Sequence, residues 1–405
     1  MKKVAVIGAG ASGLMAAYAA ANRGNEVIVF EKNEKAGKKI YITGKGRCNL
    51  TNDSSPEEVL ANVVHGEKFL RSSLHAFSPA DAMSFFEEGG LPLKVERGNR
   101  VFPVSDKASD VTKCLEKYCL RAGVRFCFEE EVRRINRKED LFHIVTSKRT
   151  ATVHAVLVCT GGVSYPSTGS TGDGYRFAEN FDVAVNALKP ALCGICCEME
   201  GLRQLQGLTL KNVALSAVRG GKKLHRLFGE MLFTHFGISG PIVLSMASLL
   251  NELPLDEVSL FIDLKPALDE DVLDKRLLRD FERYRNKQMG NALVDLLPKA
   301  LIPAVLRQSK IPFDLSVNSL PKEKRRGLLN AVKGFKLEPL SLRPMSECIV
   351  TAGGVDLKEI NPKTMESKKV PGLYFCGEVL DVDALTGGFN LQIAFSTGYA
   401  AGSSI

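Results

Sequence analysis

A glycine-rich turn near the start of the chain constrains the fold more than any other feature of the sequence. Residues 4–7 form an apolar run rich in valine and isoleucine, and a Gly-x-Gly-x-x-Gly turn from Gly8 to Gly13 follows directly. An alanine-rich segment with helical character, residues 14–21, comes next. A dinucleotide site requires a strand, a tight glycine turn and a helix N-terminus in this order. The sequence therefore predicts a β-α-β unit that binds a dinucleotide.

Each glycine of this turn has a separate task in such a site. Gly8 permits the turn, Gly10 lets the backbone approach a diphosphate, and Gly13 lets the helix pack closely against the strand. A second predicted strand, residues 27–30, ends at Glu31, where an acid that binds a ribose is expected. Such an acid disfavours a 2′-phosphate, so NADP is not expected in this pocket. The alternative is a glycine-rich turn in another kind of α/β protein.

Length and composition indicate an ordinary globular α/β protein. The chain has 405 residues, of which 45% are hydrophobic and 25% charged, enough for two or three domains. It contains no run of about 18 apolar residues, so no membrane span is expected. The first predicted strand begins almost at the N-terminus and leaves no room for a signal peptide. We predict a cytoplasmic protein.

The 10 cysteines lack the spacing of a disulfide framework, as in reduced cytosolic proteins. Cys193, Cys196 and Cys197 form the one dense cluster. A redox pair or half of a metal site is one interpretation, but no matching Cys/His pair occurs elsewhere in the sequence. We favour a buried strand that carries small thiols, and we predict no metal site.

The net charge of +8 raises the question of a nucleic-acid partner or an anionic substrate. The clearest basic patch is residues 322–326, without interleaved aromatic side chains, and the chain has no tryptophan. A solvated helix face is the better interpretation of this patch. We therefore expect a small-molecule substrate and no nucleic-acid partner.

The order of the elements predicts an α/β domain built from both ends of the chain and interrupted by an insert. After residue 190, strand patterns replace the β-α alternation, which indicates an antiparallel inserted domain. The predicted domains are 1–192, 193–343 and 344–405, the first and last forming one domain. Residues 32–52 are expected to be a loop. The predicted helices are 56–90, 106–121, 174–180, 242–250, 271–308 and 321–333. The predicted strands and hairpins are 91–104, 124–128, 131–135, 142–146, 155–162, 208–218, 259–264 and parts of 223–234.

Two further segments point to a ligand. Residues 163–174 form a loop rich in glycine and hydroxyl groups after a buried strand, where α/β proteins usually bind ligands. Near the end of the chain, a strand at residues 370–378 ends in Gly377-Glu378, and residues 390–401 have helical character. This second helix N-terminus offers N–H donors to another anionic part of the ligand. A plain C-terminal helix is the alternative, but it leaves Gly377-Glu378 unexplained.

Five motifs together carry a family resemblance that runs along nearly the whole chain. They are the glycine turn with Glu31, residues 43–52, residues 160–162 with the loop that follows, residues 233–241, and residues 377–392. The chain resembles the bacterial NAD(P)/FAD-dependent oxidoreductases that are also described as aminoacetone oxidase-like flavoproteins. Within that family it is similar to the bile-acid 3-dehydro-Δ4,6-reductases of gut bacteria. The resemblance implies a Rossmann-like FAD domain formed by both chain ends, with an inserted split β-barrel that carries helices.

The resemblance also implies positions for the parts of FAD. The residues expected at the diphosphate are Gly8, Ala9, Gly10, Ala11, Ser12 and Gly13. Glu31 is expected at the adenosine ribose, flanked by Lys32 and Val132. Expected on the flavin side are Arg47, Cys48 and Asn49, and Glu378 is expected at the ribityl chain or the diphosphate. Expected at the flavin pyrimidine edge are Asn390, Leu391, Gln392 and Ile393. The remaining expected cofactor residues are Gly44, Thr160, Gly161, Gly162, Gly377 and Gly388. Ile393 departs from the aromatic residue common in the family, and the cysteine cluster is not a family feature.

The leading functional expectation is an FAD-dependent oxidoreductase that transfers hydride through flavin N5. Its best-guess substrate is an enone or dienone such as a 3-oxo-Δ4,6 bile acid, and its reductant is NADH or NADPH bound transiently. Tyr165 and His235 are the candidate proton donors or carbonyl-orienting groups, although a loop-capping tyrosine and a core histidine are the structural alternatives. Two other functions stay open: oxygen-dependent oxidation of a small amine or aminoketone such as aminoacetone, and a flavin-dependent protein that modifies or binds nucleic acid.

Overall fold

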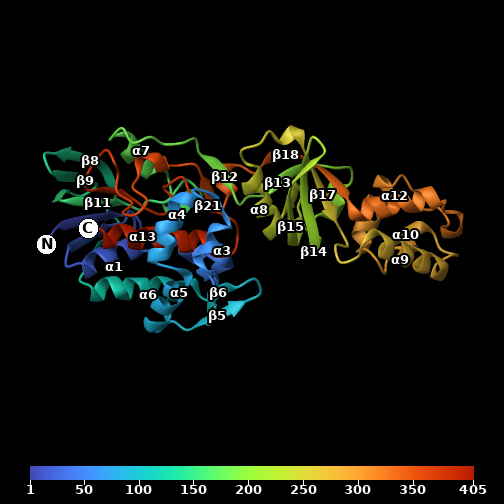
Figure 1. Ribbon diagram of the computed structural model, residues 1–405, viewed down its shortest axis with the longest axis horizontal. Coiled ribbons are helices and arrows are strands. Elements are labelled where there is room, and N and C mark those ends of the chain that lie inside the picture. The colour runs from blue at the N-terminus through green and yellow to red at the C-terminus, as the bar shows by residue number, and fades with distance from the viewer. The chain divides into compact units, whose positions relative to one another are not determined.

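The computed structural model describes residues 1–405, and the chain divides into two compact units. Unit 1 contains Met1–Ala191 and Pro344–Ile405, and unit 2 contains Leu192–Arg343. Both ends of the chain, blue and red in Figure 1, therefore belong to unit 1. Unit 1 is Rossmann-like, and unit 2 holds a closed barrel with additional helices. The predicted fold class is confirmed.

The core of unit 1 is a parallel sheet whose central strands are buried, whereas the edge strand β7 is only partly covered. Its strand order is β20-β11-β1-β2-β7, and all four pairings are parallel. The apolar runs of β1 and β11 are almost completely buried, as expected for a parallel sheet covered on both faces. The strands are β1 (Lys3–Ile7), β2 (Glu26–Phe30), β7 (Arg125–Cys127), β11 (Ala155–Val158) and β20 (Leu373–Phe375).

Helices from the two ends of the chain pack directly against each other in unit 1 (Figure 1). These are α1 (Ala11–Asn22) and α13 (Phe389–Ser403). A Cβ atom at Gly398 would lie 2.3 Å from the carbonyl oxygen of Ser12, and one at Gly402 would lie 2.3 Å from that of Ala16. Only glycine permits such an approach, so the small residues of α13 bring its backbone onto that of α1.

The other elements of unit 1 surround this core. Ser55 and Ser78 cap α3 and α5 through capping boxes, and a proline follows each serine. The remaining helices are α2 (Lys38–Ile42), α3 (Pro56–Leu60), α4 (Glu67–Ala76), α5 (Pro79–Glu88), α6 (Ala108–Arg121) and α7 (Asp173–Glu179). The remaining strands are β3 (Thr51–Asn52), β4 (Val63–His65), β5 (Leu93–Glu96), β6 (Arg100–Pro103), β8 (Val132–Lys138), β9 (Leu141–Thr146), β10 (Thr150–Val153), β12 (Lys189–Ala191), β19 (Val350–Ala352) and β21 (Asp383–Ala384).

Unit 2 is built on a closed antiparallel barrel with the strand order β13-β16-β15-β14-β17-β18. The strict alternation of buried and partly exposed residues in β17 shows that one face of the strand points into the barrel. The strands are β13 (Ile195–Glu198), β14 (Thr209–Arg219), β15 (Lys222–Phe233), β16 (Gly237–Ser239), β17 (Val258–Asp263) and β18 (Phe335–Leu342). The helices are α8 (Pro241–Leu250), α9 (Glu270–Arg283), α10 (Met289–Ala292), α11 (Ile302–Gln308) and α12 (Lys322–Lys333). No helix of the chain is long and apolar enough to span a membrane.

Several sequence expectations for individual elements were wrong. Residues 32–52, expected to be a loop, contain α2 and β3. Residues 56–90 form three helices with β4 between them, because Pro79 starts a new helix and Gly66 adopts a φ of +86°. Residues 271–308 are likewise interrupted and form α9, α10 and α11. The strand expected at 370–378 is reduced to β20, because Gly372 and Gly377 both have positive φ.

The contact between α1 and α13 predicts that Gly398→Ala destabilises the protein. The added methyl group collides with a backbone oxygen that cannot rotate away, which costs roughly 1–3 kcal/mol. Gly327→Ala in α12 is the matched control, because the nearest atom to its Cβ would be 3.6 Å away, and alanine favours a helix by up to about 1 kcal/mol. Urea unfolding at saturating FAD measures both variants. Equal stability of the two variants would contradict the contact.

Candidate active site

Protein atoms fill the space beside two glycines of the turn, and the space beside the third is empty. Gly8 has a φ of +98°, and a Cβ there would lie 2.6 Å from the carbonyl oxygen of Cys159. A Cβ at Gly13 would lie 1.9 Å from the carbonyl oxygen of Gly8. A Cβ at Gly10 would meet no atom within 4 Å. Packing therefore explains two glycines, whereas Gly10 faces open space that a ligand can enter.

The N-terminus of α1 begins at this open position. Its N-cap residue is Gly10, and no side chain caps the helix. The first backbone hydrogen bond of the helix runs from the N–H of Leu14 to the carbonyl of Gly10, at 2.9 Å. The preceding N–H groups have no partner within the helix and carry the positive end of its dipole. This arrangement suits a diphosphate.

Glu31 is buried and holds the glycine turn in place. Its side chain accepts hydrogen bonds from the backbone N–H of Ala9 at 2.8 Å and from the backbone and side chain of Asn33 at 2.9 and 2.7 Å. A carboxylate offers about four acceptor positions, so one remains for a ligand hydroxyl. The role of Glu31 at a ribose stays a prediction, and its contact with the turn is an additional role that the sequence did not reveal.

Lys32 and the start of β8, which carries Val132, both lie next to the end of β2. The ammonium group of Lys32 donates to Asp173 at 2.7 Å and to Thr171 at 2.6 Å, and so attaches the loop at residues 163–174 to β2. The N–H of Glu130 donates to the carbonyl of Glu31 at 3.0 Å, which places the start of β8 beside β2. Val132, the first residue of β8, is buried.

The Gly377-Glu378 motif meets the other predicted ligand loops through one carboxylate. Glu378 accepts hydrogen bonds from Lys39 at 2.6 Å, from the hydroxyl of Ser164 at 2.8 Å and from the N–H of Thr351 at 2.9 Å. A Cβ at Gly162 would lie 3.1 Å from the Glu378 carboxylate. The structure thus brings residues 160–162 and 377–378 together. It also shows partners, Lys39 and Thr351, that the sequence did not reveal, because they are far from Glu378 along the chain.

Arg47 and Cys48 make contacts that differ from the expected approach to the flavin. The guanidinium group of Arg47 forms ion pairs with Glu96 and Asp106 and lies 4.3 Å from the ring centre of Phe102. These ion pairs neutralise its charge within the protein. Cys48 is buried, and burial raises the pKa of its thiol to about 12, so this thiol is protonated at neutral pH. The places of both residues on the flavin side stay predictions.

Asn49 carries an orphaned polar atom next to the second helix N-terminus. Its side-chain oxygen is buried and has no hydrogen-bond partner. A Cβ at Gly388, the N-cap of α13, would lie 3.0 Å from that oxygen and 2.3 Å from the carbonyl of Thr51. An unsatisfied buried acceptor is unusual in a folded protein. A ligand N–H group at this helix end would satisfy it.

The predicted pyrimidine-edge residues contribute their backbone rather than their side chains. Asn390 uses its side chain to bind the N–H and carbonyl of Ala384, at 3.0 and 2.8 Å. Gln392 is fully buried and bonds to Thr51 and to the carbonyl of Phe77. Ile393 is buried, and Leu391 packs against the core. The first backbone bond of α13 closes on Gly388 at 3.1 Å, so the preceding N–H groups have no partner within the helix and are available to a ligand.

The two predicted proton donors belong to different units. Tyr165 lies in unit 1 with a φ of +52°, and its ring centre is 6.0 Å from the ammonium group of Lys39. Burial raises the pKa of its phenol. His235 lies in unit 2, exposed between β15 and β16, with its ring edge-on to Phe236. It is therefore not a core histidine.

The cysteine cluster lies at β13 of the barrel. Cys193 and Cys197 are buried, and Cys196 is partly exposed. Burial raises the pKa of the Cys197 thiol to about 12, so this thiol is not reactive at neutral pH. No group of three or more His, Cys, Asp or Glu side chains in the structure is arranged to hold a metal ion.

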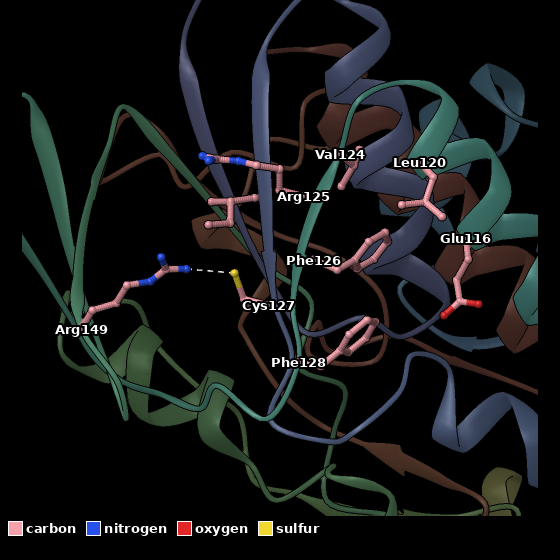
Figure 2. A pocket seen from close by; sticks show the side chains of 9 residues that line it. Glu116, Leu120, Val124, Arg125, Phe126, Cys127, Phe128 and Arg149 are labelled. Carbon is pink, nitrogen blue, oxygen red and sulfur yellow. Dashed lines mark hydrogen bonds between the residues drawn. The ribbon is translucent and has the colours of Figure 1, made fainter.

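A groove of about 570 Å³ lies at the β7 edge of the unit 1 sheet. Figure 2 shows the rings of Phe126 and Phe128 beside each other, stacked at 5.4 Å, and the guanidinium group of Arg149 directed at the sulfur of Cys127. None of the predicted cofactor residues lines this groove. It is separate from the candidate site.

Comparisons with known proteins agree on the fold and on the use of a flavin. The family described as HI0933-like protein Rossmann domain matches residues 2–404. The chain is 31% identical over 401 residues to the ribosomal RNA dihydrouridine synthase of Escherichia coli, covering 99% of this chain and 97% of that protein. It is 32% identical over 408 residues to the 3-dehydro-bile acid delta(4,6)-reductase of Clostridium scindens, covering 99% and 98%.

A solved structure shows the same fold at lower identity. The 3-ketosteroid-delta4-(5alpha)-dehydrogenase from Rhodococcus jostii RHA1 has a TM-score of 0.54 and 16% sequence identity to this chain, covering 100% of this chain and 96% of that one. The fold is therefore shared with a dehydrogenase whose sequence has diverged widely.

The residues of unit 1 fit FAD, the cofactor of this family. Open space at Gly10 and the uncapped N-terminus of α1 fit the diphosphate. The uncapped N-terminus of α13 fits the negative charge that a reduced flavin carries at its pyrimidine edge. The orphaned oxygen of Asn49 fits an N–H donor of that edge.

The open position at Gly10 predicts that Gly10→Val separates cofactor binding from folding. The valine side chain fills the space of the diphosphate without colliding with the protein, so FAD affinity falls roughly tenfold or more, while the FAD-free protein keeps its stability within about 1 kcal/mol. Gly8→Val is the contrasting variant, because its side chain collides with the backbone at Cys159. Flavin content and thermal unfolding measure both. Unchanged FAD affinity in Gly10→Val would refute the diphosphate assignment.

Proposed function

Because this chain belongs to the HI0933-like family of FAD-dependent oxidoreductases, we propose that it reduces a carbon–carbon double bond conjugated to a carbonyl group. The supporting observation is that two relatives matched along their full lengths share this chemistry in their names. A delta(4,6) double bond beside a 3-oxo group is a conjugated dienone. Dihydrouridine is uridine whose C5–C6 double bond, conjugated to the C4 carbonyl, has been reduced.

The reaction adds one hydride and one proton across the double bond. FAD, when bound, supplies the hydride through N5. The chain supplies the rest: the α1 N-terminus binds the diphosphate, the α13 N-terminus stabilises negative charge, and an acidic side chain protonates the α-carbon. The Glu378 network attaches the loop at residues 163–174, which carries Tyr165, to the C-terminal strand end.

NADH or NADPH is the reductant that we propose. The chain divides into the FAD-binding unit and the barrel unit, and neither is a second dinucleotide-binding domain. A nicotinamide that visits the flavin transiently therefore supports this chemistry better than one that is held in a domain of its own.

A steroid dienone such as a 3-oxo-Δ4,6 bile acid is the first substrate candidate. It is supported by the Clostridium scindens relative. The conjugated system of such a steroid is electrophilic, so hydride adds to its β-carbon while the carbonyl takes up charge.

A uridine in RNA is the second candidate, and the distribution of charge favours it. Most of the net charge of +8 belongs to unit 2, and unit 1 is almost neutral. On β15, Lys222, Lys223 and Arg226 are exposed, and Phe228 on the same strand is 54% exposed. Basic side chains beside an exposed aromatic ring are typical of single-stranded nucleic-acid binding. The basic patch at residues 322–326 lacks such an aromatic side chain, so β15 is the better candidate surface.

Anaerobic stopped-flow experiments test the proposed reduction. The protein is reduced with NADH, NADPH or dithionite and mixed with a 3-oxo-Δ4,6 bile acid or with unmodified ribosomal RNA. We expect at least one of them to restore the oxidised flavin spectrum and to yield the reduced product. Reoxidation by neither compound would refute the proposal, and peroxide release on aminoacetone in air would favour the amine oxidase.

Binding of labelled ribosomal RNA at several salt concentrations tests the second candidate. We expect affinity to fall steeply with salt because basic groups displace counterions from phosphate. Phe228→Ala should weaken binding roughly tenfold by removing a stacking platform. Leu340→Ala, which removes a 59% exposed side chain from β18, is the matched control. Salt-independent binding, or equal effects of both variants, would exclude this surface as the RNA contact.

A further inference from the structure

A histidine and an aspartate from distant parts of the sequence meet in unit 1. β4 ends at His65 and β21 begins at Asp383, and these two residues are partners in the antiparallel pairing of the strands. Nδ1 of His65 is hydrogen-bonded to Oδ1 of Asp383. No other histidine of the chain has a buried carboxylate as its partner: the His75–Glu57 pair, at 3.1 Å, has side chains that are 51% and 62% exposed.

The burial of the two side chains is strongly asymmetric. The side chain of Asp383 is 0% exposed, and that of His65 is 29% exposed. Oδ2 of Asp383 is also buried and has no hydrogen-bond partner. Burial raises the pKa of the Asp383 carboxyl, and the hydrogen bond with His65 opposes this rise. A carboxylate with an orphaned oxygen is costly to bury, so this pair is poorly explained by stability alone.

The pair is attached to the helix end that fits the flavin. Asn390 lies in the first turn of α13 and binds both the N–H and the carbonyl of Ala384, the residue after Asp383. On the other side, the N–H of Leu385 donates to the carbonyl of Asn62, just before β4, at 2.9 Å. The histidine is therefore positioned by the same segment that forms the N-terminus of α13.

We propose that His65 is the proton donor of the reduction and that Asp383 is its positioning residue. This inference rests on the proposed function. As hydride adds to the β-carbon of the substrate, the imidazolium of His65 gives its proton to the α-carbon and becomes neutral. Solvent returns the proton through the exposed part of the ring. Asp383 fixes the ring orientation and stabilises its charged form.

This assignment accounts for the chemistry better than the two donors expected from the sequence. Burial raises the pKa of Tyr165, so its phenol releases a proton less readily. His235 is an exposed side chain of unit 2 without a carboxylate that orients it. Of the three candidates, only His65 has an imidazole that is held by a buried carboxylate and is also partly exposed to solvent.

The first test measures how fast the reduced flavin is reoxidised. The enzyme is reduced with dithionite and mixed with whichever compound, the steroid dienone or ribosomal RNA, reoxidises the wild type. His65→Gln should slow this step roughly 100-fold or more. FAD content and the rate of reduction by dithionite should not change. His75→Gln, which removes an exposed histidine with a carboxylate partner, is the matched control and should react like the wild type.

The second test is the pH dependence of the same step. The rate should fall as pH rises and His65 loses its proton, and His65→Gln should lack this limb. Asp383→Asn should move the limb to lower pH, because the charged ring loses its partner. The carboxylates of Asp381 and Glu378 also raise the pKa of Asp383, and Glu378 is paired with Lys39. Asp381, Glu378 and Lys39 are therefore left unsubstituted in these variants. The chain has 6 histidines, and NMR titration of their rings should show the same shift for His65 without any substrate.

The outcomes separate the two proposals. If the wild type is reoxidised and His65→Gln reacts equally fast, the proton donor is another group and the proposed function stands. If neither compound reoxidises the wild type, both proposals fail. If His65→Gln does not fold, Asp383→Asn decides: an unchanged pH limb and an unchanged His65 titration would overturn the pairing.

Discussion

The contact on which unit 1 depends is the approach of backbone to backbone at its glycines. A Cβ at Gly13 would overlap the carbonyl of Gly8, and one at Gly398 would overlap that of Ser12. These contacts join the first strand, the first helix and the last helix without intervening side chains. Both helices have N-termini that no side chain caps, and in the proposed cofactor site one would bind the diphosphate and the other the far end of the ligand.

Burial of a carboxylate then organises the loops around this frame. Glu378 is only partly exposed and needs donors, because a buried carboxylate without partners is strongly unfavourable. Its donors come from Lys39, Ser164 and Thr351, three segments separated widely in sequence. The same side chain that was expected to face the cofactor therefore also holds the loops in place. Glu31 behaves in the same way toward the glycine turn.

The features that the sequence predicted are those that depend on neighbouring residues. The glycine turn, the apolar strands β1 and β11 and the amphipathic helix α6 have local signals. The barrel was expected, but its short strands β13 and β16 were not resolved individually, because their pairing partners are distant. The carboxylate partners of Arg47, Glu96 and Asp106, cannot be predicted from the motif that contains Arg47, because they lie 49 and 59 residues further along the chain. The His65–Asp383 pair was missed for the same reason.

The distribution of charge separates chemistry from substrate choice. Unit 1 contains the helix N-termini and the buried acids, and in the proposed reaction these groups would act on a conjugated carbonyl whatever molecule carries it. The exposed basic strand β15 and most of the positive charge belong to unit 2. Reduction of a steroid dienone and of a uracil ring needs the same hydride and the same proton. Under the proposed function, one set of reacting groups would serve both substrates, which is consistent with relatives of such different substrates being 31% and 32% identical to this chain.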